Sequence, residues 1–342
     1  MKKVGFFGGK FLPLHQGHVY SIIKASTMVD ELYVVLSHSE KRDQELCAGS
    51  SLSSIPCHIR LRWLSQLTKE MDNVKVVEVE DQEGNDDYNW KEGSLKIREA
   101  IGRKIDVVFS SEIEYAPTFK ELYPEAKHIL IDENREQVPI SATKIREKGV
   151  FAYWGYIPEV AKPYFIKKVV ILGTESCGKS TLTRNLALIY NTTYVKEYGR
   201  EYCEMLGGCD GIILEEDYPM IAYGHKLKEY EAIRNANKIV FIDTEAVVTQ
   251  FYSELYNQKH QTVLDEIAQI QKYDLCLYLE PDVKWVDDGL RVHGDKKVRE
   301  DNNHRLKELL KENGVKFVSI GGTYQERLEK SVELIGRTFK EI

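Results

Sequence analysis

The sequence predicts an α/β protein of two domains, each built on a parallel sheet covered by helices. Short apolar runs, such as residues 4–7 and 169–172, alternate in both halves with longer segments of helical periodicity. The length of 342 residues suits about two domains. A glycine-rich turn follows the first predicted strand of each half, at residues 8–9 and 173–178. Such turns in α/β domains are typical of phosphate-binding loops.

The predicted elements follow in order along the chain. In the first half, strands are expected at residues 4–7, 31–36, 74–79, 107–109 and 128–131, and helices at 19–28, 59–71, 94–103 and 117–123. In the second half, strands are expected at 169–172, 193–195, 239–242, 275–279 and 315–320, and helices at 182–190 and 324–342. An aromatic stretch with two prolines, residues 151–165, indicates an ordered linker. We therefore expect domains at residues 1–164 and 165–342.

Composition narrows the classes of function. The net charge of −7 disfavours a general nucleic-acid binder, so no nucleic-acid partner is expected. The six cysteines include no Cys-x-x-Cys pair, which argues against a zinc site or redox motif and favours a reducing, cytoplasmic location. The sequence shows neither a signal peptide nor an apolar run of the ~20 residues that a membrane helix needs. We therefore expect no membrane insertion.

The central glycine-rich segment matches the phosphate-loop pattern G-x-x-x-x-G-K-[ST] through Gly173, Gly178, Lys179 and Ser180. The glycines let successive backbone N–H groups turn toward an anion. Lys179 is expected to neutralise the β- and γ-phosphates of ATP and to be catalytic, and Ser180 to ligate Mg²⁺. The predicted ATP-binding residues of this half are Gly173, Thr174, Glu175, Ser176, Cys177, Gly178, Lys179, Ser180, Thr181, Arg291 and Arg299.

Other polar residues of the second half extend this predicted site. Asp243 ends an apolar strand, where it would ligate Mg²⁺ or activate a hydroxyl; a helix N-cap is the alternative. Residues 287–299 have the composition of a mobile lid whose arginines reach the phosphate, and a solvated loop is the alternative. The predicted acceptor-binding residues are Glu197, Tyr198, Arg200, Tyr202 and Asp243. Core tyrosines and surface charges are the alternative for the segment 197–202.

The first half carries a pair of histidines at the start of a helix. His15 and His18 are three residues apart and so lie on the same side of the first turn, where both can donate to phosphate oxygens. They would align an incoming phosphate with the α-phosphate of ATP, and a structural role is the alternative. A metal site is disfavoured because no third ligand stands at zinc spacing. The distant segment 140–146 offers a helix start with further phosphate ligands, or a simple Ser141 N-cap.

These motifs resemble known families. Residues 8–18 and 140–146 match both signatures of the HxGH-type nucleotidyltransferases, and the second half resembles the P-loop small-molecule kinases. Their order, the aromatic linker 153–158 and the stretch 285–291 resemble the bifunctional nicotinamide-nucleotide adenylyltransferase / ribosylnicotinamide kinase family of the NadR type. The resemblance covers nearly the whole chain. It implies a Rossmann-like transferase domain followed by a P-loop kinase domain.

The resemblance implies that nicotinamide riboside is phosphorylated by ATP and that the mononucleotide is then adenylylated to NAD and pyrophosphate. The implied partners are thus ATP, nicotinamide riboside, nicotinamide mononucleotide and NAD, with Mg²⁺ as cofactor. Trp90 would stack on the nicotinamide ring, or pack on the surface; Arg42 would bind the mononucleotide phosphate, or be one surface charge among several. The implied nucleotide-binding residues of the transferase are Gly8, Gly9, Lys10, Phe11, Leu12, His18, Arg42, Trp90, Ser110, Ser111, Glu112, Ser141, Thr143 and Arg146.

Three questions stay open at this stage. A fused pantetheine-phosphate adenylyltransferase / dephospho-coenzyme A kinase would carry the same ATP motifs, and a nucleotide-sensing regulator would bind without turnover. The NadR-type family often begins with a helix-turn-helix DNA-binding domain, but here the first predicted strand starts at about residue 3, so repressor activity is not expected. The sequence allows an oligomer without specifying one.

Overall fold

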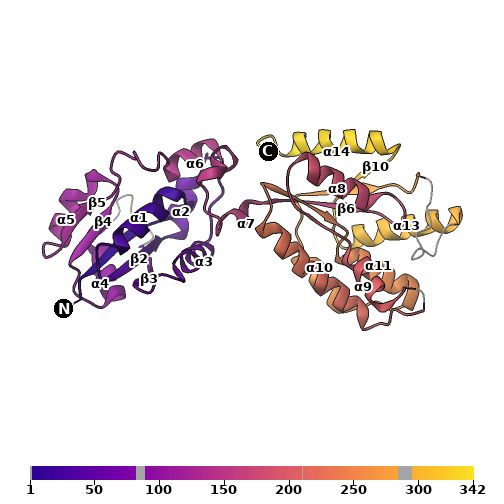
Figure 1. Ribbon diagram of the computed structural model, residues 1–342, viewed down its shortest axis with the longest axis horizontal. Helices are drawn as coiled ribbons and strands as arrows, with labels where there is room; N and C mark the ends of the chain where they lie inside the picture. The colour runs from indigo at the N-terminus through magenta and orange to yellow at the C-terminus, as the bar shows by residue number, and fades with distance from the viewer. Residues whose placement is uncertain (1, 82–88, 210, 284–294) are drawn as a thin grey trace. The chain divides into compact units, whose positions relative to one another are not determined.

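The computed structural model describes residues 2–81, 89–209, 211–283 and 295–342. Arg291 therefore lies outside the described residues. The chain forms two compact units, Met1–Lys162 and Pro163–Ile342, called unit 1 and unit 2 below (Figure 1). Each unit is an α/β fold on its own parallel sheet, so the predicted fold class is confirmed.

Unit 1 has a five-stranded parallel sheet in the order β3-β2-β1-β4-β5. Its strands are β1 (Val4–Gly9), β2 (Glu31–His38), β3 (Val74–Glu80), β4 (Val107–Ser110) and β5 (Lys127–Leu130). Its helices are α1 (Gln16–Ser26), α2 (Glu40–Cys47), α3 (Cys57–Thr68), α4 (Trp90–Ile101), η1 (Ile113–Tyr115), α5 (Ala116–Leu122), α6 (Ala142–Lys148) and η2 (Phe151–Tyr156). The strand order reverses between β1 and β4, and ligands bind at the carboxyl ends of strands at such a switch point.

Apolar side chains cover both faces of the unit 1 sheet. Phe6 of β1 and Val35 of β2 lie on one face with Ile101 of α4. Because crossovers between parallel strands are right-handed, α1 and α3, which lead from β1 to β3, cover the other face. Strand β1 requires glycine at Gly5, where a Cβ would lie 2.7 Å from the Phe109 ring of β4. Strand β1 pairs with both β2 and β4 and is the central strand of the sheet.

Three helices of unit 1 differ from the prediction. Helix α4 begins at Trp90, four residues before the predicted 94–103, with Asn89 as its N-cap. Helix α1 begins at Gln16, three residues before the predicted 19–28, because His15 caps it. Helix α2 was not predicted, since its sequence is almost entirely polar and buries only Asp43 and Cys47. Apolar periodicity cannot reveal a helix of that kind.

Unit 2 has a five-stranded parallel sheet in the order β10-β9-β6-β8-β7. Its strands are β6 (Lys167–Leu172), β7 (Tyr194–Val195), β8 (Ile239–Asp243), β9 (Leu275–Leu279) and β10 (Val318–Ile320). The helices from the unit boundary onward are α7 (Lys162–Phe165), α8 (Lys179–Ile189), α9 (Tyr198–Leu206), α10 (Asp217–Arg234), α11 (Ala246–Asn257), α12 (Thr262–Ile270), α13 (Lys296–Glu312) and α14 (Tyr324–Thr338). Figure 1 shows α8 and α14 together over the sheet, in agreement with their contact.

The core of unit 2 explains why its last helix was easier to predict than its middle ones. Val169 and Ile171 of β6 pack with Leu186 of α8 and Ile335 of α14, two helices with one apolar face. Helices α9 to α13 were not predicted. Helix α10 in particular exposes apolar residues such as Met220 while burying others, so its sequence lacks a clear amphipathic period.

One disulfide departs from the expectation that the cysteines stay reduced. Cys203 and Cys209 are bonded, with Cα atoms 5.1 Å apart. Gly207 (φ 85°) and Gly208 (φ 158°) turn the chain after α9 and bring the two residues together, which six-residue spacing alone does not indicate. Within the described ranges, no helix combines the length and apolar character needed to cross a membrane.

Candidate active sites

His15 and His18 begin α1 in a reciprocal capping arrangement. His15 is the N-cap, and its Nδ1 accepts hydrogen bonds from the backbone N–H groups of Gly17 at 3.1 Å and His18 at 3.4 Å. His18 Nδ1 in turn accepts from the N–H of His15 at 3.4 Å. The two rings stack with centroids 3.7 Å apart, and Phe11 meets the His18 ring edge-on at 4.9 Å. The backbone of the turn therefore fixes the orientation of both rings.

The environment keeps both rings neutral. Burial, aided by the guanidinium groups of Arg135 and Arg146, lowers the pKa of His15 to about 3. Burial, followed by His15 and Arg135, lowers the pKa of His18 well below its usual value. Because Nδ1 accepts a hydrogen bond in each ring, the single proton of each neutral imidazole lies on Nε2. Each histidine thus presents one N–H donor to a ligand at the helix N-terminus.

The second transferase signature meets the first in space. Arg146 of α6 donates to the carbonyl of Leu12 at 2.8 Å and to the Thr143 hydroxyl at 3.0 Å. Ser141 is the N-cap of α6 and accepts from the N–H of Lys144 at 3.2 Å. Two segments separated by more than a hundred positions therefore share one site, with a helix N-terminus contributed by each.

A charged network that sequence analysis missed supports the glycine turn. Lys10 Nζ lies 2.9 Å from Asp43 Oδ1 and 3.3 Å from Asp81 Oδ2. Asp43 also accepts from the buried Arg60, which donates with its other terminal nitrogen to the Lys10 carbonyl at 2.7 Å. Asp81 accepts from the Ser37 hydroxyl at 2.7 Å. These carboxylates lie within ordinary charged segments of the sequence and belong to no motif, so only their convergence in space reveals them.

The predicted residues after β4 lie close to α1. Ser111 Oγ is 3.3 Å from Ser21 Oγ of α1, and the Ser110 hydroxyl donates to the Glu112 carbonyl at 3.2 Å. The Glu112 carboxylate pairs with Arg135 at 2.5 Å. Arg135 thereby joins the site although no motif includes it; it also acts on the protonation of both histidines.

The remaining predicted transferase residues occupy three places. Gly8 and Gly9 end β1, and a Cβ on Gly9 would lie 3.4 Å from the Phe11 ring. Arg42 is in the first turn of α2, and its N–H donates to the Ser39 hydroxyl at 3.3 Å. Trp90 opens α4, with its ring 5.2 Å from that of Tyr115.

One cluster in unit 1 has ligand types that bind zinc. The potential ligand atoms of His38, Cys57 and Glu78 all lie within 4.8 Å of one another. Burial raises the pKa of the Cys57 thiol to about 11, so the thiol is protonated at neutral pH, and Glu78 is exposed. We assign no metal to this cluster.

The phosphate loop connects β6 to α8 as predicted. Gly173 has a φ of 141°, and a Cβ there would lie 2.7 Å from the Leu279 carbonyl oxygen of β9. Gly178 has a φ of 89°, and a Cβ there would lie 2.9 Å from the Tyr324 ring. Both positions combine a left-handed backbone with a close neighbour, so only glycine is accommodated. The loop is therefore held tightly against β9 and α14.

Lys179 lies buried at the centre of this loop. Its ammonium group donates to the Thr174 carbonyl at 2.9 Å. Burial would lower the pKa of Lys179, but the Cys177 thiol and the carboxylates of Glu197 and Asp243 outweigh burial and raise it. Lys179 is thus a fixed positive charge where phosphate would bind.

Arg327 of α14 holds the phosphate loop through its backbone, and the sequence analysis did not identify this residue. This fully buried guanidinium donates to the carbonyls of Cys177, Gly322 at 2.8 Å and Glu280 at 2.8 Å, and pairs with the Asp282 carboxylate. It therefore ties the phosphate loop to the end of β9 and the start of α14. The residue lies some 150 positions from the loop, outside the motif.

Asp243 ends β8 with a buried carboxylate. Neither of its oxygens has a hydrogen-bond partner of normal geometry in the described part of the chain. Burial and the charge of Glu197 raise the pKa of Asp243 to about 7, although Lys179, the Ser180 hydroxyl and Arg200 oppose that shift. A buried carboxylate without a hydrogen-bond partner, next to a phosphate loop, is suited to bind a proton or a cation. Its position fits the predicted role, and the N-cap of α11 is Glu245 instead.

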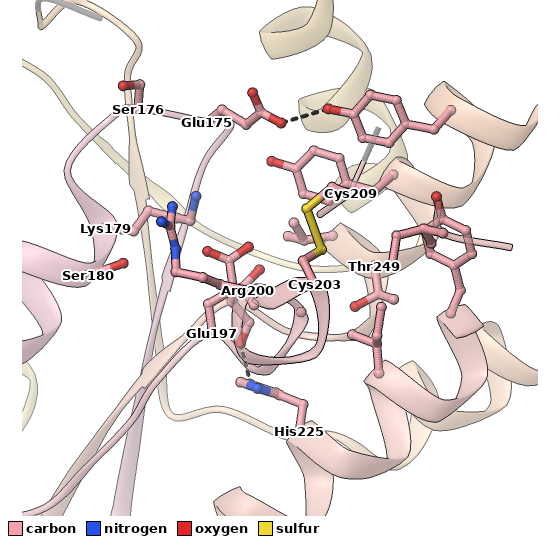
Figure 2. A pocket seen from close by; sticks show the side chains of 18 of the residues that line it. Glu175, Ser176, Lys179, Ser180, Glu197, Arg200, Cys203, Cys209, His225 and Thr249 are labelled. Atoms are coloured by element: carbon pink, nitrogen blue, oxygen red, sulfur yellow. Dashed lines mark hydrogen bonds between the residues drawn. A yellow bond between two sulfur atoms is a disulfide. The ribbon is translucent and has the colours of Figure 1, made fainter. Parts of the chain in front are cut away.

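A cavity of about 530 Å³ opens beside the loop. Glu175 and Ser180 of the loop lie at one side, together with Glu197 and Arg200, and Figure 2 shows these side chains with Lys179 around the same space. The Cys203–Cys209 disulfide forms part of the wall (Figure 2). The volume is in the range of small-molecule sites.

The tyrosines of this cavity are not the ones that the sequence analysis named. Tyr198 lies against Gly224 of α10, and Tyr202 donates to Asp217 at 2.7 Å; neither lines the cavity. The lining tyrosines are Tyr218, Tyr252 and Tyr256. The rings of Tyr252 and Tyr256 stack at 5.8 Å, and the Tyr256 hydroxyl donates to Glu175 of the phosphate loop at 2.7 Å. Their spacing on α11 resembles any amphipathic helix, so sequence offered no signal.

Arg299, predicted to reach over the phosphate, lies in the first turn of α13. Both of its terminal nitrogens donate to the Val283 carbonyl at 3.3 Å. It is not among the residues that line the cavity.

Comparisons with known proteins agree with this pair of sites. Residues 6–148 match the cytidylyltransferase-like family and residues 168–327 the AAA domain family. The chain is 37% identical over 342 residues to the trifunctional NAD biosynthesis/regulator protein NadR of Escherichia coli K12, covering 98% of this chain and 83% of that protein.

Two solved structures match nearly the whole chain. The NadR protein in complex with NR has a TM-score of 0.80 at 27% identity, covering 99% of this chain and 96% of that one. The NadR protein in complex with NAD and AMP-PNP has a TM-score of 0.80 at 25% identity, covering 99% and 97%. The chain belongs to the NadR family.

Proposed function

We propose that this chain makes NAD from nicotinamide riboside in two ATP-dependent steps. Unit 2 phosphorylates the riboside to nicotinamide mononucleotide, and unit 1 joins the mononucleotide to AMP. The observation that carries this proposal is the family relationship over 98% of the chain, to a NAD biosynthesis protein. Both phosphate sites are intact in the described structure, which supports two activities rather than one.

In the kinase step, the 5′-hydroxyl oxygen of the riboside attacks the γ-phosphorus of ATP. A new O–P bond forms while the bond between the γ-phosphorus and the β–γ bridging oxygen breaks, and ADP leaves. Asp243 accepts the hydroxyl proton, since its buried carboxylate lies beside the loop and neither oxygen has a hydrogen-bond partner within the described residues. Lys179 and the loop N–H groups stabilise the charge that develops on the phosphate oxygens.

The kinase site also fits Mg²⁺, and we propose that Ser180 and Asp243 would hold it. The supporting feature is the buried Asp243 carboxylate without a hydrogen-bond partner in the described structure. Carboxylate and hydroxyl oxygens are the donors that Mg²⁺ prefers. When bound, the ion neutralises phosphate charge.

In the transferase step, a phosphate oxygen of the mononucleotide attacks the α-phosphorus of a second ATP. The α–β bridging bond breaks and pyrophosphate leaves. His15 and His18 donate their Nε2 protons as hydrogen bonds to phosphate oxygens, and Arg146 is close enough to assist. Because both rings are neutral, they orient the phosphates without transferring a proton to them.

The acceptor pockets are assigned by the same reasoning. We propose that the riboside occupies the cavity of unit 2, with Glu197 and Arg200 at the sugar and the Tyr252–Tyr256 pair near the ring. A pyridinium cation is attracted to aromatic faces and to the Glu175 and Glu197 carboxylates. In unit 1, Trp90 and Arg42 remain proposed contacts for the nicotinamide ring and the mononucleotide phosphate.

Product analysis tests the proposal. With nicotinamide riboside, ATP and Mg²⁺, we expect ADP and the mononucleotide first, then NAD and pyrophosphate. Lys179→Ala should remove the first activity and leave the second, and His18→Ala should do the reverse. Loss of both activities in either variant, with its fold retained, would contradict the two-site assignment.

The alternatives make different predictions. A fused coenzyme A enzyme would turn over dephospho-coenzyme A and ignore nicotinamide riboside. A nucleotide-sensing regulator would bind ATP without producing ADP. The NadR relationship covers both units, which favours the NAD enzyme over either alternative. We further propose that the catalytic domains divide at residues 1–164 and 165–342 and that the enzyme works in the cytoplasm.

A further inference from the structure

The Cys203–Cys209 disulfide lies in the wall of the unit 2 cavity, and the proposed kinase reaction makes no use of it (Figure 2). Cys203 of α9 is buried, and Cys209, six residues further along the chain, is half-buried. Disulfides of cytoplasmic proteins are usually transient and serve catalysis or redox sensing rather than stability. The cytoplasmic location proposed above therefore directs attention to reversible reduction of this bond.

The disulfide fixes a segment of chain that lines the cavity. The carbonyl oxygen of Cys209 accepts hydrogen bonds from the N–H groups of Ile212 and Ile213, both at 3.2 Å. Ile213 and Leu214 line the cavity. The Ile213 carbonyl in turn accepts from the side-chain amide of Asn257 on α11 at 3.4 Å. Fixing Cys209 therefore helps to fix the backbone of Ile213 at the cavity.

The residues around Cys209 do little to order this segment by themselves. Three glycines in left-handed conformations lie near it: Gly207 (φ 85°), Gly208 (φ 158°) and Gly211 (φ 67°). Glycine loses more conformational freedom on ordering than any other residue. Leu214 is 54% exposed, so its burial contributes only part of what it could. Once the disulfide opens, a ligand that needs this wall binds more weakly, because its binding must also order the segment.

We propose that Cys203 and Cys209 form a redox switch that sets the affinity of the unit 2 cavity for the riboside. The inference rests on the proposed kinase function of unit 2. The disulfide form holds the cavity wall as the structure has it, whereas the dithiol form has a looser wall and a higher KM for the riboside. The phosphate loop lies outside the crosslinked segment, so the KM for ATP stays the same in both forms.

The switching reaction is thiol–disulfide exchange with a dithiol reductant. One thiolate of the reductant attacks the sulfur of Cys209, the more exposed of the two cysteines, and the S–S bond breaks. Cys203 leaves as a thiolate and takes up a proton. The second thiolate of the reductant then attacks the mixed disulfide, so that the reductant leaves as a disulfide and Cys209 becomes a thiol. Two electrons pass to the protein, and a low-molecular-weight disulfide such as oxidised glutathione reverses the reaction.

A third cysteine of the cavity wall, Cys177, is not suited to this exchange. It belongs to the phosphate loop, is fully buried, and donates to the Thr174 carbonyl at 3.0 Å. Burial raises the pKa of the Cys177 thiol and so keeps it protonated, whereas exchange requires a thiolate. A redox response of riboside binding is therefore assigned to Cys203 and Cys209.

The test measures the KM for nicotinamide riboside and for ATP in buffers of oxidised and reduced dithiothreitol, with the disulfide content read by alkylation and mass spectrometry. Complete reduction should raise the KM for the riboside about tenfold and leave the KM for ATP unchanged; the entropy of closing a six-residue loop limits the rise to about 50-fold. Cys209→Ser should show the high KM in every buffer. Cys57→Ser, which removes a free cysteine of unit 1, should respond to the buffers as the wild type does.

A merely structural disulfide would give a different result. Reduction would then lower the melting temperature and leave the KM for the riboside unchanged, and that outcome overturns the inference. An equal rise in the KM for ATP, a disulfide that excess dithiothreitol cannot reduce in the folded enzyme, or six alkylated thiols in oxidising buffer would also overturn it. Adenylyltransferase activity, measured in parallel, should not vary with the buffer. Absence of ADP production from nicotinamide riboside in both redox forms would instead overturn the proposed kinase function, and this inference with it.

Discussion

Replacing Arg327 tests whether the phosphate loop depends on an anchor outside its motif. Arg327→Met keeps the length of the side chain and its apolar stem but removes the guanidinium. The change leaves the carbonyls of Cys177, Gly322 and Glu280 without their donor, and the Asp282 carboxylate without its cation. The carbonyl of Cys177 belongs to the loop itself, so we expect weaker ATP binding as well as lower stability of unit 2.

The expected loss of stability follows from these contacts. Each of the three carbonyl hydrogen bonds contributes about 1 kcal/mol net. The Asp282 side chain is 45% exposed and can be solvated, so the loss of its ion pair adds little to this sum. We therefore expect about 3 kcal/mol, roughly a hundredfold in the unfolding equilibrium of unit 2. The total free energy of unfolding of a domain is only about 5–15 kcal/mol, so this loss is a large part of it.

Hydrogen exchange provides the assay. Amides of β6 and α8 lie in the core of unit 2 and report its global opening, so their protection should fall about a hundredfold in Arg327→Met. Amides of β1 serve as an internal control because they belong to unit 1. The matched variant is Arg337→Met on the same helix. The Arg337 side chain is 75% exposed and forms a surface ion pair with Glu333, so this variant should change protection little. Equal protection in the two variants would refute the anchoring argument.

Three further perturbations address the sites directly. Gly17→Ala places a Cβ 3.0 Å from the His15 ring, and the overpacking of about 1–3 kcal/mol should lower transferase activity about 10-fold while kinase activity, measured in parallel, stays unchanged. Asp243→Asn should reduce kinase kcat by ~10²–10⁴-fold, yet raise the melting temperature of unit 2 at pH 8, because it removes a buried carboxylate whose pKa of about 7 shows that ionisation is disfavoured. A lower melting temperature would contradict that reading. Unit 1 should lose stability as pH falls from 6.5 toward about 3, since unfolded His15 binds a proton that the folded ring refuses. The slope contributed by His15 approaches about 1.4 kcal/mol per pH unit below about pH 5.5, where the unfolded histidine is almost fully protonated. Urea titrations between about pH 4.5 and 5.5 should find this slope missing in His15→Asn, which keeps an N-cap.

The sequence predicted the sheets better than the helices around them. The central strands of these sheets contain continuous apolar runs, such as residues 239–242 of β8, and such runs stand out because buried parallel strands need apolar residues on both faces. Helix α10 shows why some helices were hard to predict: Tyr218, Ile221 and His225 line the cavity, while apolar residues such as Met220 are exposed, so no single apolar face marks the helix. Helices α9 and α12 do carry one apolar face, and the sequence analysis overlooked it.

Within the sites, too, the sequence predicted some residues and gave no indication of others. A phosphate loop imposes local demands, such as the left-handed backbone of Gly178 followed directly by Lys179, and these demands appear as a contiguous motif. Residues that contact the site from distant positions in the sequence belong to no contiguous motif. Arg60, Arg135 and Arg327 are ordinary charges in the sequence, and only the fold shows what their guanidinium groups touch.

The two phosphate sites also differ in how they carry charge, and this bears on acceptor choice. Unit 1 offers neutral imidazole N–H donors, whereas unit 2 sets Lys179 among the carboxylates of Glu175, Glu197 and Asp243. Asp243 has its proposed role in the transfer itself, but the carboxylates of Glu175 and Glu197 do not help to bind an anionic triphosphate and must serve another purpose. A cationic pyridinium ring gives them one, because it is attracted by charges that would repel an anionic acceptor and would give a neutral one no advantage. The acidic wall of the kinase cavity therefore argues for a positively charged riboside independently of any motif.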